Sequence, residues 1–175
     1  MSTRRLVACA AAAALCTGYA CADGPKLGKP LTAADLAAWD ISVLPDGTGL
    51  PPGSGNAAQG AAIYAQKCIA CHGENGKGGI GAALVTDRKI TSINAGEKSI
   101  ANFWPYATTV FDIIRRAMPW TQPRTLSNDE VYALTAYILA QNKLIDENAV
   151  MNAETLPKVR MPNRDGFIVR FPEKM

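Results

Sequence analysis

Two cysteines and the only histidine of the chain lie together in the segment Lys67-Cys68-Ile69-Ala70-Cys71-His72. The pattern Cys-x-x-Cys-His is the attachment signature of a c-type haem. Positions three apart share one face of a helical turn, so both thiols can reach the two vinyl groups on one porphyrin edge. We therefore predict one covalent haem c, attached through Cys68 and Cys71 and coordinated at its iron by His72.

Three other interpretations of this motif are open. A structural zinc site needs a fourth Cys or His ligand, but the remaining cysteines, Cys9, Cys16 and Cys21, all lie near the N-terminus. A thioredoxin-like redox pair needs a strand–helix context, which the flanking residues do not supply. The third alternative is a chance match in an ordinary helix. The features described below favour haem independently of the motif.

The composition is that of one small domain with extensions. The chain has 175 residues and a formal charge of +3, a length that allows a single domain. Beyond residue 22 it holds 16 basic and 15 acidic residues, a net charge of +1. This near-neutral balance gives no support for a nucleic-acid partner or for a polybasic contact with a membrane.

Residues 1–22 have the pattern of an export signal. Two arginines precede an apolar run over residues 6–15, and Ala20-Cys21-Ala22 is a small-x-small cleavage site. The apolar run is too short to span a membrane. We therefore predict a cleaved signal peptide and a soluble periplasmic protein, with lipid attachment at an N-terminal cysteine as the alternative. Cleavage would leave only the two haem cysteines, so we expect no structural disulfide.

The rest of the chain divides into an extended arm over 23–55, a haem domain over 56–145 and an extended tail over 146–175. In the arm, Leu36, Trp39 and Ile41 are the predicted anchors on the domain surface, and an undocked flexible linker is the alternative. Proline and glycine between residues 45 and 55 predict that no regular structure forms there. In the tail, the proline-containing segment 161–166 predicts a turn.

Three helices are predicted in the haem domain. Asn56 caps a helix over 57–67, Pro105 suits the first turn of a helix that ends near residue 117, and Ser127 opens a capping box for a helix that fades by 141–142. The last helix carries an apolar stripe on one side, formed by Val131, Leu134, Tyr137, Ile138 and Leu139. We expect Tyr137 to pack against Gly60 and Tyr64 of the first helix.

Five glycines follow His72 within residues 73–81. A phosphate-cradling loop would need a preceding strand and a following Lys-Ser/Thr pair, and the sequence has neither. We therefore predict a tight loop packed against the porphyrin edge.

Met118 is the predicted sixth ligand of the iron. Methionine commonly fills the second axial position in electron-carrying c-type haem proteins, and Met118 lies at a predicted helix end, just before a proline. Met1 belongs to the leader, while Met151, Met161 and Met175 follow the last predicted helix. Core packing of the Met118 side chain is the alternative.

The order of capped helix, Cys-x-x-Cys-His, glycine-rich loop, Met-Pro and closing helix resembles a class I cytochrome c over residues 56–142. The resemblance implies an all-α fold, a small helical bundle around one covalent haem, with the arm and tail as extensions. In that family a proline carbonyl some ten residues after the histidine accepts the imidazole N–H. No proline occurs here between His72 and Pro105, so a carbonyl near residues 80–82 must accept that hydrogen bond.

Further segments are similar to those of cytochrome subunits that work with molybdenum sulfite dehydrogenases. They are Ala38-Trp39-Asp40-Ile41, the stretch 49–55, the stretch 104–109, Ile114-Arg115-Arg116-Ala117-Met118-Pro119 and the stretch 161–167. The same strings occur in the cytochrome subunit of the sulfane dehydrogenase of thiosulfate oxidation. This resemblance implies electron transfer from the molybdenum subunit to a downstream cytochrome or oxidase, rather than catalysis by this chain alone. It does not distinguish the two donors.

Several expectations concern the surroundings of the haem. Candidate partners of the propionates are Arg88, Lys89, Trp104, Arg115 and Arg116. The residues predicted to rim the exposed haem edge are Ile69, Ala70, Pro119 and Trp120. A haem enzyme with an open iron, such as a peroxidase, would require that Met118 does not bind, and a purely structural haem domain is a further alternative.

Overall fold

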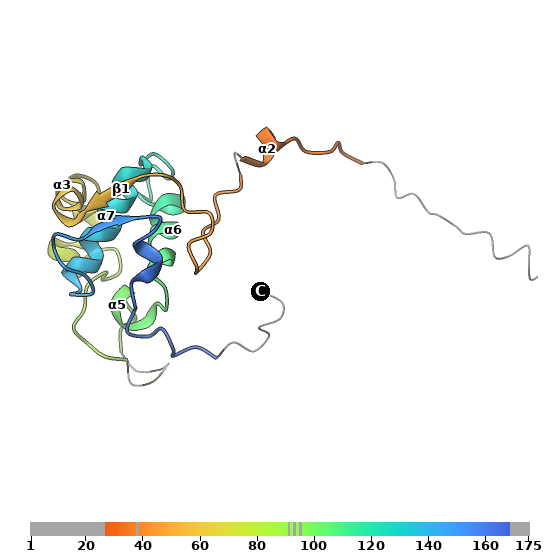
Figure 1. Cartoon of the computed structure of the whole chain (residues 1–175). Coiled ribbons are helices and arrows are strands. Elements are labelled where there is room, and N and C mark those ends of the chain that lie inside the picture. The colour runs from red at the N-terminus through yellow and green to blue at the C-terminus, as the bar shows by residue number, and fades with distance from the viewer. Residues whose placement is uncertain (1–26, 38, 91, 93, 95, 169–175) are drawn as a thin grey trace, which may run out of the picture. The chain divides into compact units, whose positions relative to one another are not determined.

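The computed structural model describes residues 27–37, 39–90, 92, 94 and 96–168. It divides into two compact units, 1–39 and 40–175 (Figure 1). The predicted signal peptide lies outside the described residues. Among the described helices, none combines the length and apolar character that a membrane crossing requires. The domain boundaries and the export signal stay predictions.

The described part of the first unit contains one short helix, α2 (Ala33–Ala37). The Asp35 carboxylate accepts hydrogen bonds from the backbone N–H of Thr32 (2.9 Å) and from its hydroxyl (2.7 Å). These bonds stabilise the charged form and lower the pKa of Asp35. Leu36 and Trp39 have exposed fractions of 51% and 81%, and the anchoring role that the sequence predicts for them stays a prediction.

The second unit is built on the helices α3 (Ala57–Lys67), α6 (Ala107–Ala117) and α7 (Asn128–Gln141). Shorter helices, α4 (Ile69–His72), η1 (Glu74–Gly76), α5 (Ile100–Phe103) and η2 (Leu156–Lys158), lie between and after them. Within the described residues, the predicted helical bundle is present. Reciprocal capping boxes, Asn56 with Gln59 and Ser127 with Glu130, start α3 and α7 where the sequence predicts.

Helices α3 and α7 pack closely because α3 carries a glycine at their contact. A methyl group on Gly60 would lie 2.6 Å from the carbonyl carbon of Ala133 and 2.7 Å from Cβ of Tyr137. The ring centroids of Tyr64 and Tyr137 are 5.0 Å apart. The predicted packing of Tyr137 against Gly60 and Tyr64 is confirmed.

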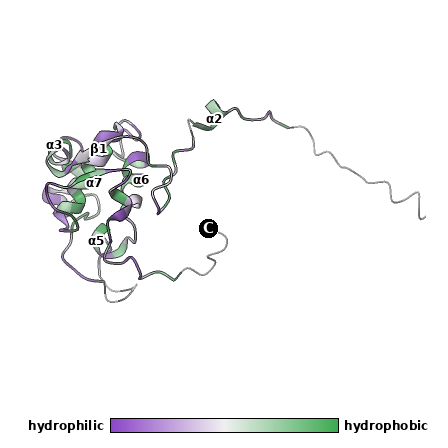
Figure 2. Ribbon diagram, viewed as in Figure 1, coloured by the Kyte–Doolittle hydropathy of each residue, from purple (hydrophilic) through white to green (hydrophobic). Residues whose placement is uncertain are grey.

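Helix α7 is buried on more sides than its sequence stripe predicts. Every residue from 131 to 139 is buried, and Figure 2 shows apolar character along this helix. The segment that precedes α3 covers its outer side: Tyr132 Oη donates to the Pro51 carbonyl (2.9 Å) and Asn128 Nδ2 to the Pro52 carbonyl (3.2 Å).

A two-stranded antiparallel sheet corrects the prediction that residues 45–55 have no regular structure. Strand β1 (Ser54–Asn56) pairs with β2 (Val150–Asn152), with Gly55 opposite Met151. A methyl group on Gly55 would lie 2.6 Å from Cα of Ala133, so the glycine that suggested a loop instead lets the strand lie against α7. The strand exists because a distant part of the chain pairs with it.

Helix α6 begins later than the sequence predicts. Tyr106 is its N-cap and Ala107 its first residue, so Pro105 precedes the helix instead of lying in its first turn. Tyr106 forms an isolated antiparallel bridge with Arg160 of the tail, which holds its backbone extended. The end at Ala117 is as predicted.

The tail is part of the core of the second unit. Leu156 and Met161 are buried, and the predicted turn is present, with the Gly166 N–H donating to the Asn163 carbonyl (3.1 Å). Asn163 Nδ2 also donates to the Phe103 carbonyl (2.6 Å). The tail therefore holds α5 and the start of α6 in place.

Candidate haem site

The Cys-x-x-Cys-His motif occupies the turn between α3 and η1. Cys68 ends α3, with its N–H donating to the Tyr64 carbonyl (2.9 Å), and α4 continues to His72, whose N–H donates to the Cys68 carbonyl (3.0 Å). Cys68, Cys71 and His72 all line one pocket. The helical spacing thus presents both thiols and the imidazole to the same space, as the motif predicts.

The imidazole of His72 is oriented by a backbone carbonyl. His72 Nδ1 lies 2.8 Å from the Ala82 oxygen. Because a carbonyl oxygen can only accept, Nδ1 carries the proton, which leaves Nε2 as the free lone pair for a metal. The predicted hydrogen bond to a carbonyl within residues 80–82 is confirmed, and Ala82 supplies it without the proline that is usual in the family.

The glycines after His72 allow the loop to fold back over the motif. The Gly78 N–H donates to the His72 carbonyl and the Gly81 N–H to the Cys71 carbonyl, both at 2.8 Å. A methyl group on Gly81 would lie 3.2 Å from Nδ1 of His72. Gly78 has a φ of 100°, which side chains with a Cβ rarely adopt. The loop therefore brings the Ala82 carbonyl to the imidazole.

The far end of this loop is held by a residue that the sequence analysis did not single out. Asn142, just after α7, donates through Nδ2 to the Leu84 carbonyl (3.0 Å) and accepts at Oδ1 from the Thr86 N–H (3.1 Å). An asparagine at a helix end is common, so its sequence position carried no signal for this long-range role.

Met118 lies at the C-terminus of α6 and lines the same pocket as His72. Met151 and Met161 are buried elsewhere, with exposed fractions of 4% and 1%, and neither lines the pocket. Among the described methionines, Met118 is thus the one brought to the motif. Ligation of iron by His72 and Met118 stays a prediction that this placement supports.

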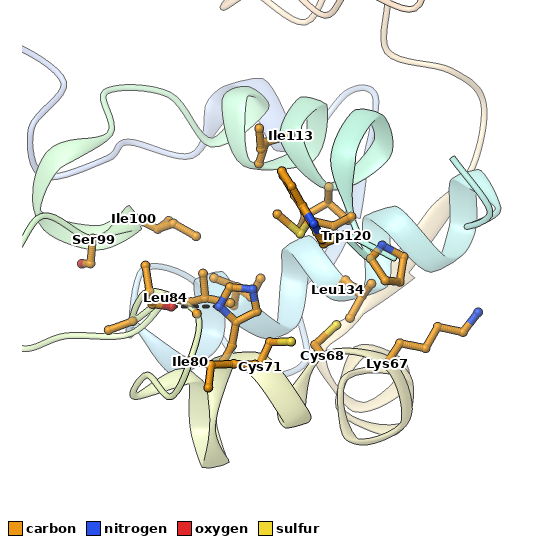
Figure 3. A pocket seen from close by; sticks show the side chains of 18 of the residues that line it. Lys67, Cys68, Cys71, Ile80, Leu84, Ser99, Ile100, Ile113, Trp120 and Leu134 are labelled. Carbon is orange, nitrogen blue, oxygen red and sulfur yellow. Dashed lines mark hydrogen bonds between the residues drawn. The ribbon is translucent and has the colours of Figure 1, made fainter. Parts of the chain in front are cut away.

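The pocket has a volume of about 670 Å³, within the range of about 300–1,000 Å³ that is typical of cofactor sites. Its wall is mainly apolar, with side chains from the glycine loop, α6 and α7 (Figure 3); they include Leu84, Ile100, Ile113, Ile114, Leu126, Leu134 and Ile138. Two thiols, a free imidazole nitrogen and a thioether converge on this apolar space. The residues present therefore fit a covalently bound haem.

The two cysteines differ in their surroundings. Burial raises the pKa of the Cys68 thiol to about 11, although the neighbouring Lys67 ammonium opposes the shift. In the haem-free chain this thiol is therefore neutral at physiological pH. Cys71 is exposed.

The residues predicted to bind the propionates lie in different places. Trp104 lines the pocket, whereas Arg88, Lys89, Arg115 and Arg116 do not. Arg116 pairs with Asp112 (2.8 Å), and Arg115 Nη1 donates to the Ile41 carbonyl (3.4 Å). A role for Trp104 stays a prediction, and the two arginines of α6 have partners away from the pocket.

Three large apolar side chains of the pocket lining are exposed, and a fourth, which does not line the pocket, is exposed in the motif. Ile80 and Trp120 line the pocket with exposed fractions of 91% and 79%, and Ile113 lines it at 36%. Ile69, in the motif itself, is 37% exposed. Of the predicted rim residues, Pro119 and Trp120 line the pocket, and Ala70 is exposed beside the cysteines. Ile80 was not predicted, because an isolated apolar residue among glycines carries no periodic signal.

Within the described ranges, no cluster of three or more His, Cys, Asp or Glu side chains is arranged to hold a metal ion. The alternative of a structural zinc site therefore has no ligand set in this part of the chain.

Comparison with known proteins gives consistent results. Residues 55–138 match the family model described as cytochrome c oxidase, cbb3-type, subunit III. A 44-residue segment is 50% identical to the cbb3-type cytochrome c oxidase subunit FixP of Bradyrhizobium sp. (strain ORS 278). That segment covers 23% of this chain and only 15% of the relative, so the likeness concerns a small part of FixP.

A solved structure is similar over most of the chain. A chain in the crystal structure of the sulfane dehydrogenase SoxCD from Paracoccus pantotrophus is 36% identical, with a TM-score of 0.78. The match covers 86% of this chain and 75% of that one. The shared region is thus much longer than the motif and its immediate surroundings.

Proposed function

Since the chain belongs to the class I cytochrome c family and is an electron carrier with a covalent haem, we propose that it accepts electrons from a periplasmic molybdenum dehydrogenase that oxidises sulfite. A downstream cytochrome or oxidase is the proposed acceptor. The observation that supports a dehydrogenase donor is the 36% identity, over 86% of the chain, to a chain of a sulfane dehydrogenase complex. Sulfite as the substrate of that donor rests on the resemblance of the segments named above to cytochrome subunits of molybdenum sulfite dehydrogenases. The match to a cbb3-type oxidase subunit supports an acceptor of the oxidase class.

The chain's own residues serve this function by binding and orienting. We expect Cys68 and Cys71 to form the two thioether bonds, with the Ala82 carbonyl fixing the orientation of the His72 ring. Met118 offers the sixth ligand, and a thioether ligand raises the reduction potential. The haem supplies a reversible one-electron centre, and the apolar wall excludes water from it.

Electron exchange requires a surface where a partner can approach the pocket. The mouth carries exposed Trp120 and Ile80, and no acidic side chain of the described residues lines the pocket. Because the surface at the mouth is mostly apolar and the mature chain is nearly neutral, we expect association to depend on apolar burial, with weak salt dependence of the on-rate.

The decisive experiment mixes the purified cytochrome with a periplasmic molybdenum sulfite dehydrogenase from the same organism and adds sulfite. The haem should be reduced within catalytic turnover times, as followed by its visible absorption. A Trp120→Ala variant should be reduced more slowly at an unchanged potential, with Trp39→Ala as the control, because Trp39 does not line the pocket. Rapid reduction by an unrelated donor, combined with failure of this one, would refute the assignment.

A second candidate is the cytochrome subunit of a sulfane dehydrogenase. The similarity to a chain of the SoxCD sulfane dehydrogenase favours it. The same assay separates the two donors, since a sulfane donor should reduce the haem with a protein-bound sulfane substrate and leave it oxidised with sulfite alone.

We further propose that the mature protein begins near Asp23, is periplasmic and carries one haem. The sequence contains a single Cys-x-x-Cys-His motif and an N-terminal export pattern. The intact mass of the exported protein should correspond to residues 23–175 plus one haem. A mass that retains residues 1–22, or lacks the haem increment, would contradict this.

A further inference from the structure

One wall of the haem pocket contains a buried polar group without a partner. Ser99 is 3% exposed and lines the pocket. Its N–H donates to Asn102 Oδ1 (2.8 Å), and its Oγ faces the Asn102 backbone N–H as in a capping box, but among the described residues no group accepts a hydrogen bond from the hydroxyl. An unpaired buried hydroxyl is costly, so a ligand in the pocket that accepts its hydrogen bond would explain why it is there.

The residue before it supplies a positive charge at the same wall. Lys98 lines the pocket and its Nζ lies 5.2 Å from the centroid of the Phe103 ring. It forms no ion pair with any residue that the structure describes. The other lining cation differs, because Lys67 Nζ lies 3.8 Å from the Glu130 carboxylate. The pocket lining includes no acidic side chain.

A hydroxyl donor and an ammonium group on adjacent residues of one pocket lining are suited to a carboxylate. The haem carries two propionate carboxylates on the ring edge opposite the vinyl groups. Figure 3 shows Ser99 on the far side of the pocket from Cys68 and Lys67, and therefore away from the attachment edge. We propose that Ser99 Oγ and Lys98 Nζ bind one haem propionate. The proposal rests on haem attachment, but on no particular electron donor.

The surrounding structure holds this wall ready for a ligand. Ser99 precedes α5, and Asn102 Nδ2 donates to the Glu97 carbonyl (2.9 Å). Asn163 of the tail donates to the Phe103 carbonyl (2.6 Å). Hydrogen bonds on both sides therefore fix the backbone that carries the serine, which reduces the ordering cost of binding the carboxylate.

The first test compares two serines that precede helices. In the haem-loaded protein, Ser99→Ala should shift the propionate bending band in the resonance Raman spectrum. It should also lower the midpoint potential, because an uncompensated carboxylate stabilises ferric iron. Ser99→Thr keeps the hydroxyl, so it should leave both the Raman band and the midpoint potential near their wild-type values. Ser127→Ala removes a hydroxyl that accepts the Glu130 N–H (3.2 Å), and should reduce stability without either change.

The second test uses the exposed lysine, whose replacement does not disturb the core. Lys98→Gln should lower the potential and shift the same Raman band. Lys67→Gln should leave the Raman band unchanged, because Lys67 lies on the other side of the pocket from Ser99 (Figure 3). This pair keeps the proposal testable if Ser99→Ala does not fold.

The proposal is overturned if Ser99→Ala lowers stability while the band and the potential stay at their wild-type values, since Ser99 would then serve only α5. It is also overturned if Lys67→Gln and Lys98→Gln have equal effects on both readouts. All measurements are made without a donor, so failure here leaves the covalent haem and reduction by a dehydrogenase intact. Failure of the proposed donor, in turn, leaves these readouts unchanged.

Discussion

Helix α7 packs against protein atoms on one of its inward sides and borders the haem pocket on the other. Toward α3, Ala133 and Tyr137 meet Gly60 at close range, and the chain itself fills the space. Toward the pocket, Leu134 and Ile138 face about 670 Å³ that a haem fits. The α3–α7 contact is filled by protein atoms alone, whereas the pocket side needs the cofactor as part of the core. We therefore expect a damaged α3–α7 face to change stability, and a damaged pocket face to change the haem as well.

The largest expected effect comes from preventing haem attachment. In a Cys68→Ala/Cys71→Ala variant without haem, the pocket side loses its central apolar body, and voids of this size are strongly destabilising. Amide hydrogen exchange should become fast in α6 and in the loop after Met118, while α3 and the facing part of α7 keep more protection. Equal loss of protection in all helices would show that the α3–α7 contact and the pocket side lose their structure together.

The second largest effect is expected at the contact between α3 and α7. Gly60→Ala places a methyl group 2.6 Å from the Ala133 carbonyl carbon, so the helices must separate. We expect a loss of about 3 kcal/mol in the free energy of unfolding, with the haem spectrum retained. Ala62→Leu, at an exposed position of the same helix, is the control and should cost little. Denaturant unfolding of both variants makes the comparison.

Replacing Met118 and Met151 in turn tests whether the pocket side of the fold determines the spectrum and the potential of the haem. Met118→Ala should abolish the weak near-infrared sulfur-to-iron band of the oxidised protein and lower its potential. Met151→Ala empties a buried site on the other side of the fold and should cost about 2–5 kcal/mol of stability with the band intact. If the band survives the first change and disappears in the second, the assignment of Met118 is wrong.

The smallest effect comes from a hydrogen bond next to the motif. Tyr64 Oη donates to the Gly73 carbonyl (2.8 Å), and Tyr64→Phe should cost about 1 kcal/mol. Burial, together with nearby Cys68 and Tyr137, raises the pKa of Tyr64 from 10.0 to about 12.

The sign of the pH dependence follows from that shift. Folding favours the neutral phenol, so this contribution to stability is complete below the unfolded-state pKa of about 10 and is lost as pH rises to about 12. The free energy of unfolding should therefore be larger for wild type than for Tyr64→Phe at neutral pH. This difference should narrow above about pH 10. A constant difference would mean that folding does not shift the pKa of Tyr64.

The residues at the cofactor could be found from sequence because their chemistry depends on local spacing. Cys68 and Cys71 are three residues apart, a spacing that places both on one face of a helix, and His72 follows directly. The caps Asn56 and Ser127 were also predictable, since each bonds a residue three positions away. The carbonyl partner of His72 was placed near residues 80–82 by the resemblance to class I cytochromes c.

Only the tertiary structure decided the features that depend on distant segments. Helix α7 was predicted with one apolar stripe, yet Tyr132 and Thr135 are also buried, because the segment before α3 covers that side. Gly55 indicated a loop, but it forms a strand because Met151 is its partner. Nothing in the sequence singled out Ser99. Its significance appeared when α5 placed it, buried and unpaired, in the haem pocket. Short-range spacing is visible along a sequence, whereas burial depends on which remote segments complete the surface.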